Sequence, residues 1–247
     1  MRLALFLVPL LMLAGCGGGN GGEIAADATG TPAAPVAAVA PPAGKQWTDI
    51  VAKTPEGGYL MGNPDAPIKL LEYGSRSCPV CGRFSVEAME PLKEKYIKTG
   101  KVSLEFRDFP VHPQDPGITL LGRCVDKDRY FPILEAMFAA QPEIFERQQK
   151  IPEAAYAQLE GLPRPKQAAA LADMLGYVDF MKQRGVPEAK ARQCLNDPKM
   201  LEELTGEMKA TAERGVNGTP TFYINGRQVK DVVSWSQLEP VLKGAGA

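Results

Sequence analysis

The order in which an apolar strand, two cysteines and a helix follow one another constrains the fold of this chain more than any other feature. The run IKLLEY (residues 68–73) is nearly continuously apolar, as expected of a central strand that is buried on both faces. SRSCPVCGRF (75–84) follows it at once. From Cys81 onward apolar side chains recur at helical spacing, and VSLEFR (102–107) alternates as a strand does. The sequence therefore predicts a β-α-β unit with its cysteines at the start of the helix.

A long helical stretch separates this unit from the last part of the chain. Between about residues 115 and 215 the apolar side chains follow a helical period, and no strand pattern interrupts them. GVNGTPTFYINGRQV then returns to β character, with an Asn225-Gly226 turn between two short strands, and SWSQLEPVLKG closes the chain as a helix. We therefore predict an α/β domain whose sheet is built from residues 46–114 and 216–247, with a helical domain, residues 115–215, inserted between them.

The first sixteen residues indicate export. Residues 1–15 combine Arg2 with LALFLVPLLML, an apolar run of about eleven residues that is too short to span a bilayer and is typical of a signal peptide. The run ends in LAGC, which resembles the bacterial lipobox, where the cysteine becomes the lipidated first residue. The alternative is an ordinary signal peptide that is cut a little further on. We expect a periplasmic, membrane-anchored lipoprotein with lipid on Cys16.

The segment after this cysteine carries little information for folding. Residues 16–45 are almost all Gly, Ala and Pro without apolar periodicity, so we expect a disordered tether. The tether contains no candidate dimerisation element, and we expect a monomer. The formal net charge of −1 gives no global field that would recruit nucleic acid, so we expect no nucleic-acid partner.

Two cysteines at this spacing can share a zinc ion, anchor a haem or exchange a disulfide with another protein. A structural zinc needs about four ligands, whereas the chain has one histidine, His112, in an exposed connection to which we assign no role. Covalent haem normally requires a histidine directly after the second cysteine, where Gly82 stands. A purely structural disulfide across two residues would constrain the unfolded chain very little. We therefore expect no metal and no cofactor, and favour disulfide exchange.

The position of the two cysteines at the start of a helix predicts different roles for their thiols. Unpaired backbone N–H groups and the positive end of the helix dipole favour the thiolate of Cys78, which we expect to be exposed and acidic. Cys81 lies one turn further, on the apolar face, and should be buried. Cys78 is then the sulfur that partners reach, and Cys81 closes or releases the internal disulfide.

Three separated motifs carry a resemblance to a known family. GNPDAPIKLLEY, SCPVC and GVNGTPTFYING stand in the order found in the DsbA-type periplasmic thiol:disulfide oxidoreductases, and the chain resembles that family over about residues 46–245. The resemblance implies a thioredoxin fold with an inserted helical domain. It also implies that Pro220 is cis and lies against the active disulfide, although an ordinary turn proline is the alternative. Substrate peptide is then expected to lie along Thr219, Pro220, Pro79 and Val80.

The same resemblance gives a role to an acid in the first strand. Glu72 interrupts the apolar strand where the family places a buried acid beneath the disulfide, and a buried carboxyl can relay the proton of the buried thiol. The alternative is a glutamate at a strand end that faces water.

Two further cysteines lie in the helical stretch. Cys124 and Cys194 could be buried free thiols, since cysteine is often a core residue. In an oxidising compartment a disulfide is favoured, and related proteins with cysteines at similar places have one. We expect it to be structural.

The direction of exchange is open between two readings. The leading hypothesis is oxidation of thiols in exported proteins, after which a membrane oxidant resets the disulfide. Val80 stands where the best-known strong oxidants have histidine, and Thr219 also occurs in reductive and isomerising relatives. The runner-up is therefore a periplasmic reductase or isomerase. A lipid-anchored binding or chaperone module whose disulfide is incidental is a third hypothesis.

Overall fold

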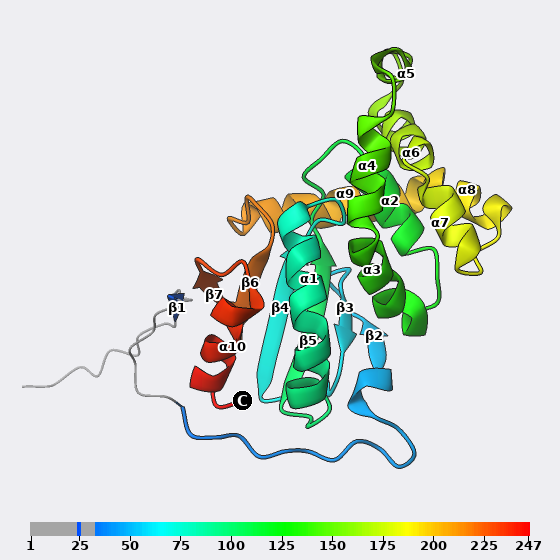
Figure 1. The fold of residues 1–247 in the computed structure, drawn as a ribbon. Coiled ribbons are helices and arrows are strands. Elements are labelled where there is room, and N and C mark those ends of the chain that lie inside the picture. Colours follow the sequence, from blue (N-terminus) through cyan, green and yellow to red (C-terminus); the bar gives the residue numbers. More distant parts are fainter. Residues whose placement is uncertain (1–23, 26–32) are drawn as a thin grey trace, which may run out of the picture.

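A seven-stranded sheet forms the centre of the computed structural model, which describes residues 24–25 and 33–247 (Figure 1). The strands lie side by side in the order β1-β7-β6-β4-β5-β3-β2. Their bounds are β1 Ile24–Ala25, β2 Val51–Lys53, β3 Tyr59–Met61, β4 Ile68–Gly74, β5 Val102–Asp108, β6 Thr221–Ile224 and β7 Arg227–Lys230.

The central strand β4 joins the two halves of the sheet. It pairs with β5 in parallel, from the Ile68–Val102 pair to the Gly74–Asp108 pair, and with β6 in antiparallel orientation. Helix α1 (Pro79–Leu92) connects β4 to β5, so the β-α-β unit predicted from the sequence is present.

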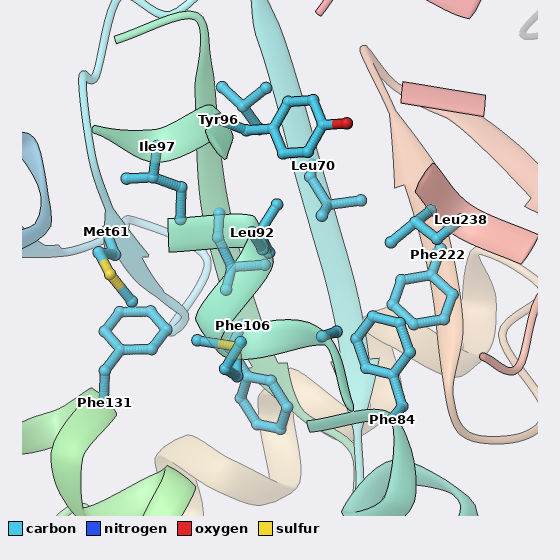
Figure 2. Packing of buried hydrophobic residues seen from close by; sticks show 14 of the residues in the cluster. Met61, Leu70, Phe84, Leu92, Tyr96, Ile97, Phe106, Phe131, Phe222 and Leu238 are labelled. Carbon is cyan, nitrogen blue, oxygen red and sulfur yellow. The ribbon is translucent and has the colours of Figure 1, made fainter. Parts of the chain in front are cut away.

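Helices α1 and α10 (Trp235–Gly244) pack their apolar faces on this sheet in one core. Figure 2 shows Phe84 of α1 against Phe222 of β6, whose ring centres are 4.6 Å apart. Both rings are almost fully buried, and burying a side chain of this size stabilises the fold by roughly 1.5–3 kcal/mol. The core therefore fixes the start of α1 relative to the end of β4.

The insertion is helical throughout, as predicted. Its helices are α2 Asp115–Gly122, α3 Tyr130–Ala139, α4 Gln141–Gln149, α5 Glu153–Ala157, α6 Arg164–Met174, α7 Tyr177–Gln183, α8 Glu188–Leu195 and α9 Pro198–Glu213. Shorter turns are the 3-10 helices η1 Trp47–Asp49 and η3 Lys127–Arg129 and the π-helix η2 Lys93–Ile97. A second apolar core includes Ile118, Met137 and Met181. A disulfide between Cys124, just after α2, and Cys194 in α8 adjoins this core, as expected.

The C-terminal hairpin also agrees with its prediction. Asn225 and Gly226 both have positive φ, 49° and 77°, which a tight two-residue turn between twisted strands requires. The hairpin adds β6 and β7 to the open side of β4.

Two strands at the other edge were not foreseen. β2 and β3 have three residues each, and β3 is held by antiparallel pairing with β5. These two strands form because β3 pairs with β5, which lies more than forty positions further along the chain. A local sequence pattern cannot reveal such a pairing.

The N-terminal strap (residues 33–45) differs from the sequence expectation. The sequence assigns it to the disordered tether, but the backbone N–H of Val36 donates to Gly246 O (2.8 Å) and that of Val39 to Thr99 O (2.9 Å). The strap runs along the end of the molecule where α10 ends (blue in Figure 1). Backbone groups supply these bonds, so a Gly/Ala/Pro composition does not exclude order here.

The predicted signal peptide, residues 1–15, and the lipidation site Cys16 lie outside the described residues. Within residues 24–25 and 33–247, each helix is too short or too polar to cross a membrane.

Candidate functional site

The two cysteines stand at the junction of β4 and α1. The cysteine loop (residues 75–78) leaves the end of β4, Cys78 is the N-cap of α1, and Pro79 occupies the first helical position, where a missing N–H costs nothing. Both thiols are free, so the structure represents the dithiol form. Cys81 is fully buried as expected, but Cys78 is only 6% exposed, which corrects the expectation of an exposed thiol.

The segment before β6 covers Cys78. The Thr219-Pro220 peptide bond is cis, and the Sγ of Cys78 lies 3.5 Å from the carbonyl oxygen of Thr219, which accepts a hydrogen bond from Cys78 while that thiol is protonated. Thr219, which lies 141 positions away along the chain, therefore contributes to the burial of Cys78. Pro79 is exposed and Val80 is half-buried beside it, so these two side chains border the accessible side of the thiol.

The two thiols differ strongly in acidity. The pKa of Cys78 is lowered from 9.0 to about 5, chiefly by a hydrogen bond from Cys81; burial opposes the shift, and the N–H groups of Cys81 and Val80 add to it. Burial raises the pKa of Cys81 well above its usual range, and its hydrogen bond to Cys78 adds to the rise. At neutral pH the pair is therefore a thiolate at the helix start and a protonated thiol beneath it.

Glu72 supplies a buried acid to the same site. It lies on β4, is 3% exposed, and its Oε1 has no hydrogen-bond partner in the described part of the chain. Desolvation by burial, and secondarily the charge of Cys78, raise its pKa from 4.5 to about 8. Its charge in turn raises the pKa of Cys81. Glu72 is therefore a carboxyl that can hold or release a proton near the buried thiol at neutral pH.

Asp115, at the start of α2, holds the cysteine loop in place. Its carboxylate accepts hydrogen bonds from Ser75 Oγ (2.7 Å), Ser77 N (3.0 Å), Val111 N (2.9 Å) and His112 N (2.9 Å). Burial raises the pKa of the fully buried Asp115, but hydrogen bonds outweigh this effect and lower it, first the one with the His112 side chain and then those from Val111 N, Ser75 and His112 N. The carboxylate thus fixes the loop from the side of the inserted domain.

A second residue of the inserted domain contacts the loop from α4. Gln141 Nε2 donates to the carbonyl oxygens of Arg76 and Cys78, both at 3.0 Å. Gly82 of α1 allows this approach, because a side chain at that position would overlap the Gln141 amide. Two helices of the insertion therefore position the backbone around Cys78.

Arg76, inside the cysteine loop, anchors a buried ion network. Its guanidinium is fully buried and donates to Asp108 Oδ1 at 2.6 Å. Asp108 also accepts from Arg123 Nε (2.9 Å) and the Tyr130 hydroxyl (3.0 Å). Arg123 continues to Glu207 of α9 at 2.8 Å. The network joins the loop to β5, α3 and α9.

The sequence pointed to Cys78, Cys81, Glu72, Thr219 and Pro220, and the structure brings these five together. Sequence patterns did not identify the residues that hold the cysteine loop, which are Arg76, Asp108, Asp115 and Gln141. The only local signal was Arg76, a charged residue directly after a buried strand. The partners come from β5, α2 and α4, so their role is visible only after folding. His112 also lies closer to the site than expected, since its Nδ1 is 2.9 Å from Ser77 Oγ.

Comparisons with known proteins agree with this geometry. A family model described as thioredoxin matches residues 54–244. A putative protein-disulfide oxidoreductase of Rickettsia bellii is 26% identical over 183 residues, which are 74% of this chain and 62% of that relative. A probable disulfide bond formation protein D of Bacillus cereus is 26% identical over 166 residues, 67% of this chain and 69% of that protein. The chain thus spans less than two thirds of the length of the Rickettsia relative.

Solved structures give the same fold. The protein-disulfide isomerase from Novosphingobium aromaticivorans is 29% identical, with a TM-score of 0.71 over 76% of this chain and 96% of that chain. Wolbachia pipientis α-DsbA1 is 23% identical, with a TM-score of 0.56 over 76% and 89% of the two chains. The predicted fold class, a thioredoxin fold with an inserted helical domain, is confirmed.

Proposed function

Because the chain belongs to the thioredoxin family, we propose that it is a thiol:disulfide oxidoreductase that acts through Cys78 and Cys81. One observation carries the proposal. The fold gives two neighbouring thiols very different pKa values, since it lowers the pKa of Cys78 to about 5 and raises that of Cys81. A structural or incidental pair does not require such a difference, whereas an exchanging pair needs one nucleophile and one proton carrier.

The proposed reaction is oxidation of thiols in exported proteins. A substrate thiolate attacks the Sγ of Cys78 in the Cys78–Cys81 disulfide, the S–S bond breaks, and Cys81 leaves and takes up a proton. A second substrate thiolate attacks the substrate sulfur of the mixed disulfide, so that the substrate disulfide forms and Cys78 leaves as thiolate. Glu72 donates the proton to Cys81 and recovers it from solvent. Thr219 and Pro220 would hold the substrate peptide beside Pro79 and Val80.

The acidity of Cys78 favours oxidation over reduction. A thiol of low pKa is a good leaving group, and stabilising its thiolate stabilises the reduced form, which makes the disulfide more oxidising. The hydrogen bonds from Cys81 and from the N–H groups at the start of α1 provide this stabilisation although position 80 carries valine. A membrane oxidant of thiols would then regenerate the disulfide.

Isomerisation of wrongly paired disulfides is the second candidate. The observation in its favour is the likeness to the protein-disulfide isomerase from Novosphingobium aromaticivorans, which is 29% identical. An isomerase works from the dithiol state, so it should reshuffle a scrambled protein without any added oxidant.

The test is a set of exchange assays on the wild type and on Cys78→Ser. We expect the wild type to form disulfides in a reduced, unfolded test protein and Cys78→Ser to be inactive. The double variant Cys124→Ala/Cys194→Ala, which removes the other disulfide, should keep the activity. Equal activity of wild type and Cys78→Ser would overturn the proposal in favour of a binding module.

The redox potential of the cysteine pair distinguishes an oxidase from a reductase. Equilibrium of the Cys78–Cys81 pair with a glutathione buffer should give a reduction potential of about −120 mV for a strong oxidase, whereas a potential of about −270 mV would indicate a reductase.

The site of action is proposed to be the periplasmic face of a membrane, with lipid attached at Cys16. Metabolic labelling with a fatty acid should mark the wild type and not Cys16→Ser, and labelling of both would contradict this attachment site.

A further inference from the structure

His112 is a titratable group next to the cysteine loop that the proposed reaction does not use. It lies in the connection between β5 and α2, and its side chain is 42% exposed. Its Nδ1 is 2.9 Å from the Oγ of Ser77 and 3.4 Å from the Oδ2 of Asp115. Ser77 directly precedes Cys78, so the imidazole ring stands one residue away from the thiolate. Sequence reasoning treated this histidine as ordinary surface.

The surroundings of His112 favour its protonated form. The hydrogen bond with Asp115 and the charge of that carboxylate raise its pKa, partial burial opposes the rise, and the charge of Cys78 adds to it. Gln114 faces the same hydroxyl as the imidazole and donates to Ser77 Oγ at 3.3 Å. On the other side of the connection, Arg164 of α6 lines a cavity together with the neighbours of His112, Val111 and Pro113. The charged groups around the ring are thus two anions, the Asp115 carboxylate and the Cys78 thiolate, and one cation across a cavity, Arg164.

The first turn of α1 contributes no charged side chain to the site. The first turn of that helix contains Pro79, Val80, Cys81 and Gly82, none of which carries a positive charge at any pH. A cation that responds to the state of Cys78 has to come from another element, and the connection that carries His112 is held against the cysteine loop by Asp115.

We propose that His112 is a positioning residue whose protonated fraction rises when the Cys78–Cys81 disulfide is reduced, so that more positive charge stands beside the Cys78 thiolate. The inference rests on the proposed disulfide exchange. A substrate dithiol supplies two electrons and two protons, and its own sulfurs become a disulfide. One proton is bound by Cys81. Of the other, which formation of the Cys78 thiolate releases, a fraction is bound by neutral His112 and the remainder passes to solvent. Charge and atoms balance, since both substrate protons end on Cys81, on His112 or in solvent.

The chain contains a single histidine, which makes the test direct. The imidazole signal in a proton NMR spectrum belongs to His112 without assignment, and it can be titrated in both redox states. We expect the midpoint of this titration to be higher in the dithiol form than in the disulfide form. By reciprocity of linked equilibria, the thiolate of Cys78 should be favoured by protonation of His112 to the same extent. Equal midpoints in the two forms would overturn the inference.

Two single-thiol variants form a matched control. Cys81→Ser keeps the Cys78 thiolate and should retain the high midpoint, whereas Cys78→Ser lacks the thiolate and should show the midpoint of the disulfide form. Equal midpoints in these two variants would also overturn the inference. Because neither variant can form the disulfide, this comparison is independent of exchange activity. A protein that exchanges no disulfides but shows the difference would lose the proposed function and keep the electrostatic coupling.

Replacement of the histidine tests the reverse effect. In His112→Gln the absorbance of the thiolate near 240 nm should titrate at higher pH, with about a twofold smaller ratio of thiolate to thiol near pH 5, since a factor of two in this ratio corresponds to a few tenths of a pKa unit. Val111→Ala, an adjacent change that removes no charge, should leave this titration unchanged. An unaltered titration in His112→Gln would contradict the coupling.

Discussion

Glu72 lies on the central strand with 3% of its surface exposed, and burial raises its pKa from 4.5 in the unfolded chain to about 8. Since the folded-state pKa lies above the unfolded one, the folded state holds the extra proton between these values. The stability due to this group is therefore complete below about pH 4.5 and is lost as pH rises to about 8. The slope in this window should approach about 1.4 kcal/mol per pH unit.

Glu72→Gln should remove this pH dependence. Glutamine cannot ionise, so the free energy of unfolding of the variant should exceed that of the wild type increasingly from pH 5 to pH 8, as measured by urea denaturation with both cysteines reduced. Glu87→Gln, on the exposed side of α1, should keep the wild-type slope. Parallel pH profiles for Glu72→Gln and wild type would contradict a buried neutral carboxyl.

The same variant has a kinetic consequence. Glutamine cannot relay a proton, so oxidation of the dithiol by a disulfide substrate should slow by about a hundredfold at neutral pH, the size of a typical general acid–base contribution. Stopped-flow mixing with oxidised glutathione would measure it, and an unchanged rate would assign proton transfer to water alone.

Single residues with a local signal could be read from the sequence, and residues whose role depends on a distant partner could not. The spacing of Cys78 and Cys81, and Glu72 inside an apolar strand, are features of one short segment. Gln141 looks like an ordinary helix-start residue, and its contact with the carbonyl of Cys78 spans 63 positions. The expected exposure of Cys78 failed for the same reason, because the covering residue, Thr219, is distant in sequence.

At the scale of elements, the packing of α2 on α6 depends on a glycine. A side chain at Gly117 would overlap the backbone carbonyl of Ala168 in α6, and backbone has little freedom to move away. Gly117→Ala should therefore destabilise the fold by about 1–3 kcal/mol, the usual cost of overpacking.

Gly206 of α9 is the matched control. No atom lies within 4 Å of a side chain placed there, so Gly206→Ala should stabilise the helix, by up to about 1 kcal/mol. Thermal unfolding of the two variants measures both effects. Similar shifts of both melting temperatures would mean that α2 and α6 can separate without cost.

The elements themselves were predictable where a period repeats. The helices of the insertion and the strands β4, β5, β6 and β7 follow from local patterns and turn residues. β2 and β3 could not be predicted, because three residues contain too little alternation and their stability comes from pairing with β5. The order of the strap likewise comes from backbone hydrogen bonds to distant carbonyls.

At the scale of the whole molecule, the Cys124–Cys194 disulfide ties together helices of the insertion across 70 positions. Removing a link that closes a loop of this length should cost about 4 kcal/mol of unfolding free energy in the chain-entropy estimate. Urea denaturation of Cys124→Ala/Cys194→Ala measures this cost. The redox potential of the Cys78–Cys81 pair should stay the same if the bridge is purely structural, and a shifted potential would instead reveal coupling between the insertion and the site.

The chain meets the folded domain at β1, which pairs with β7 at the edge of the sheet, and only then forms the N-terminal strap. The strap contacts Thr99 and Gly246, at the end of the molecule where α10 and η2 finish, whereas Cys78 stands at the opposite end of α1 (Figure 1). Residues 79–97 of α1 and η2 separate these ends by roughly 28 Å of helix axis. If lipid at Cys16 holds the protein, the attached chain reaches the domain first at β1, whose partner Val229 is level with Phe222 and Glu72, near the cysteine end of β4. The anchor would then lie on the side of the sheet near the thiols while the strap runs on to the far end of the domain, so a bilayer-embedded oxidant would not have to reach over the domain to meet Cys78.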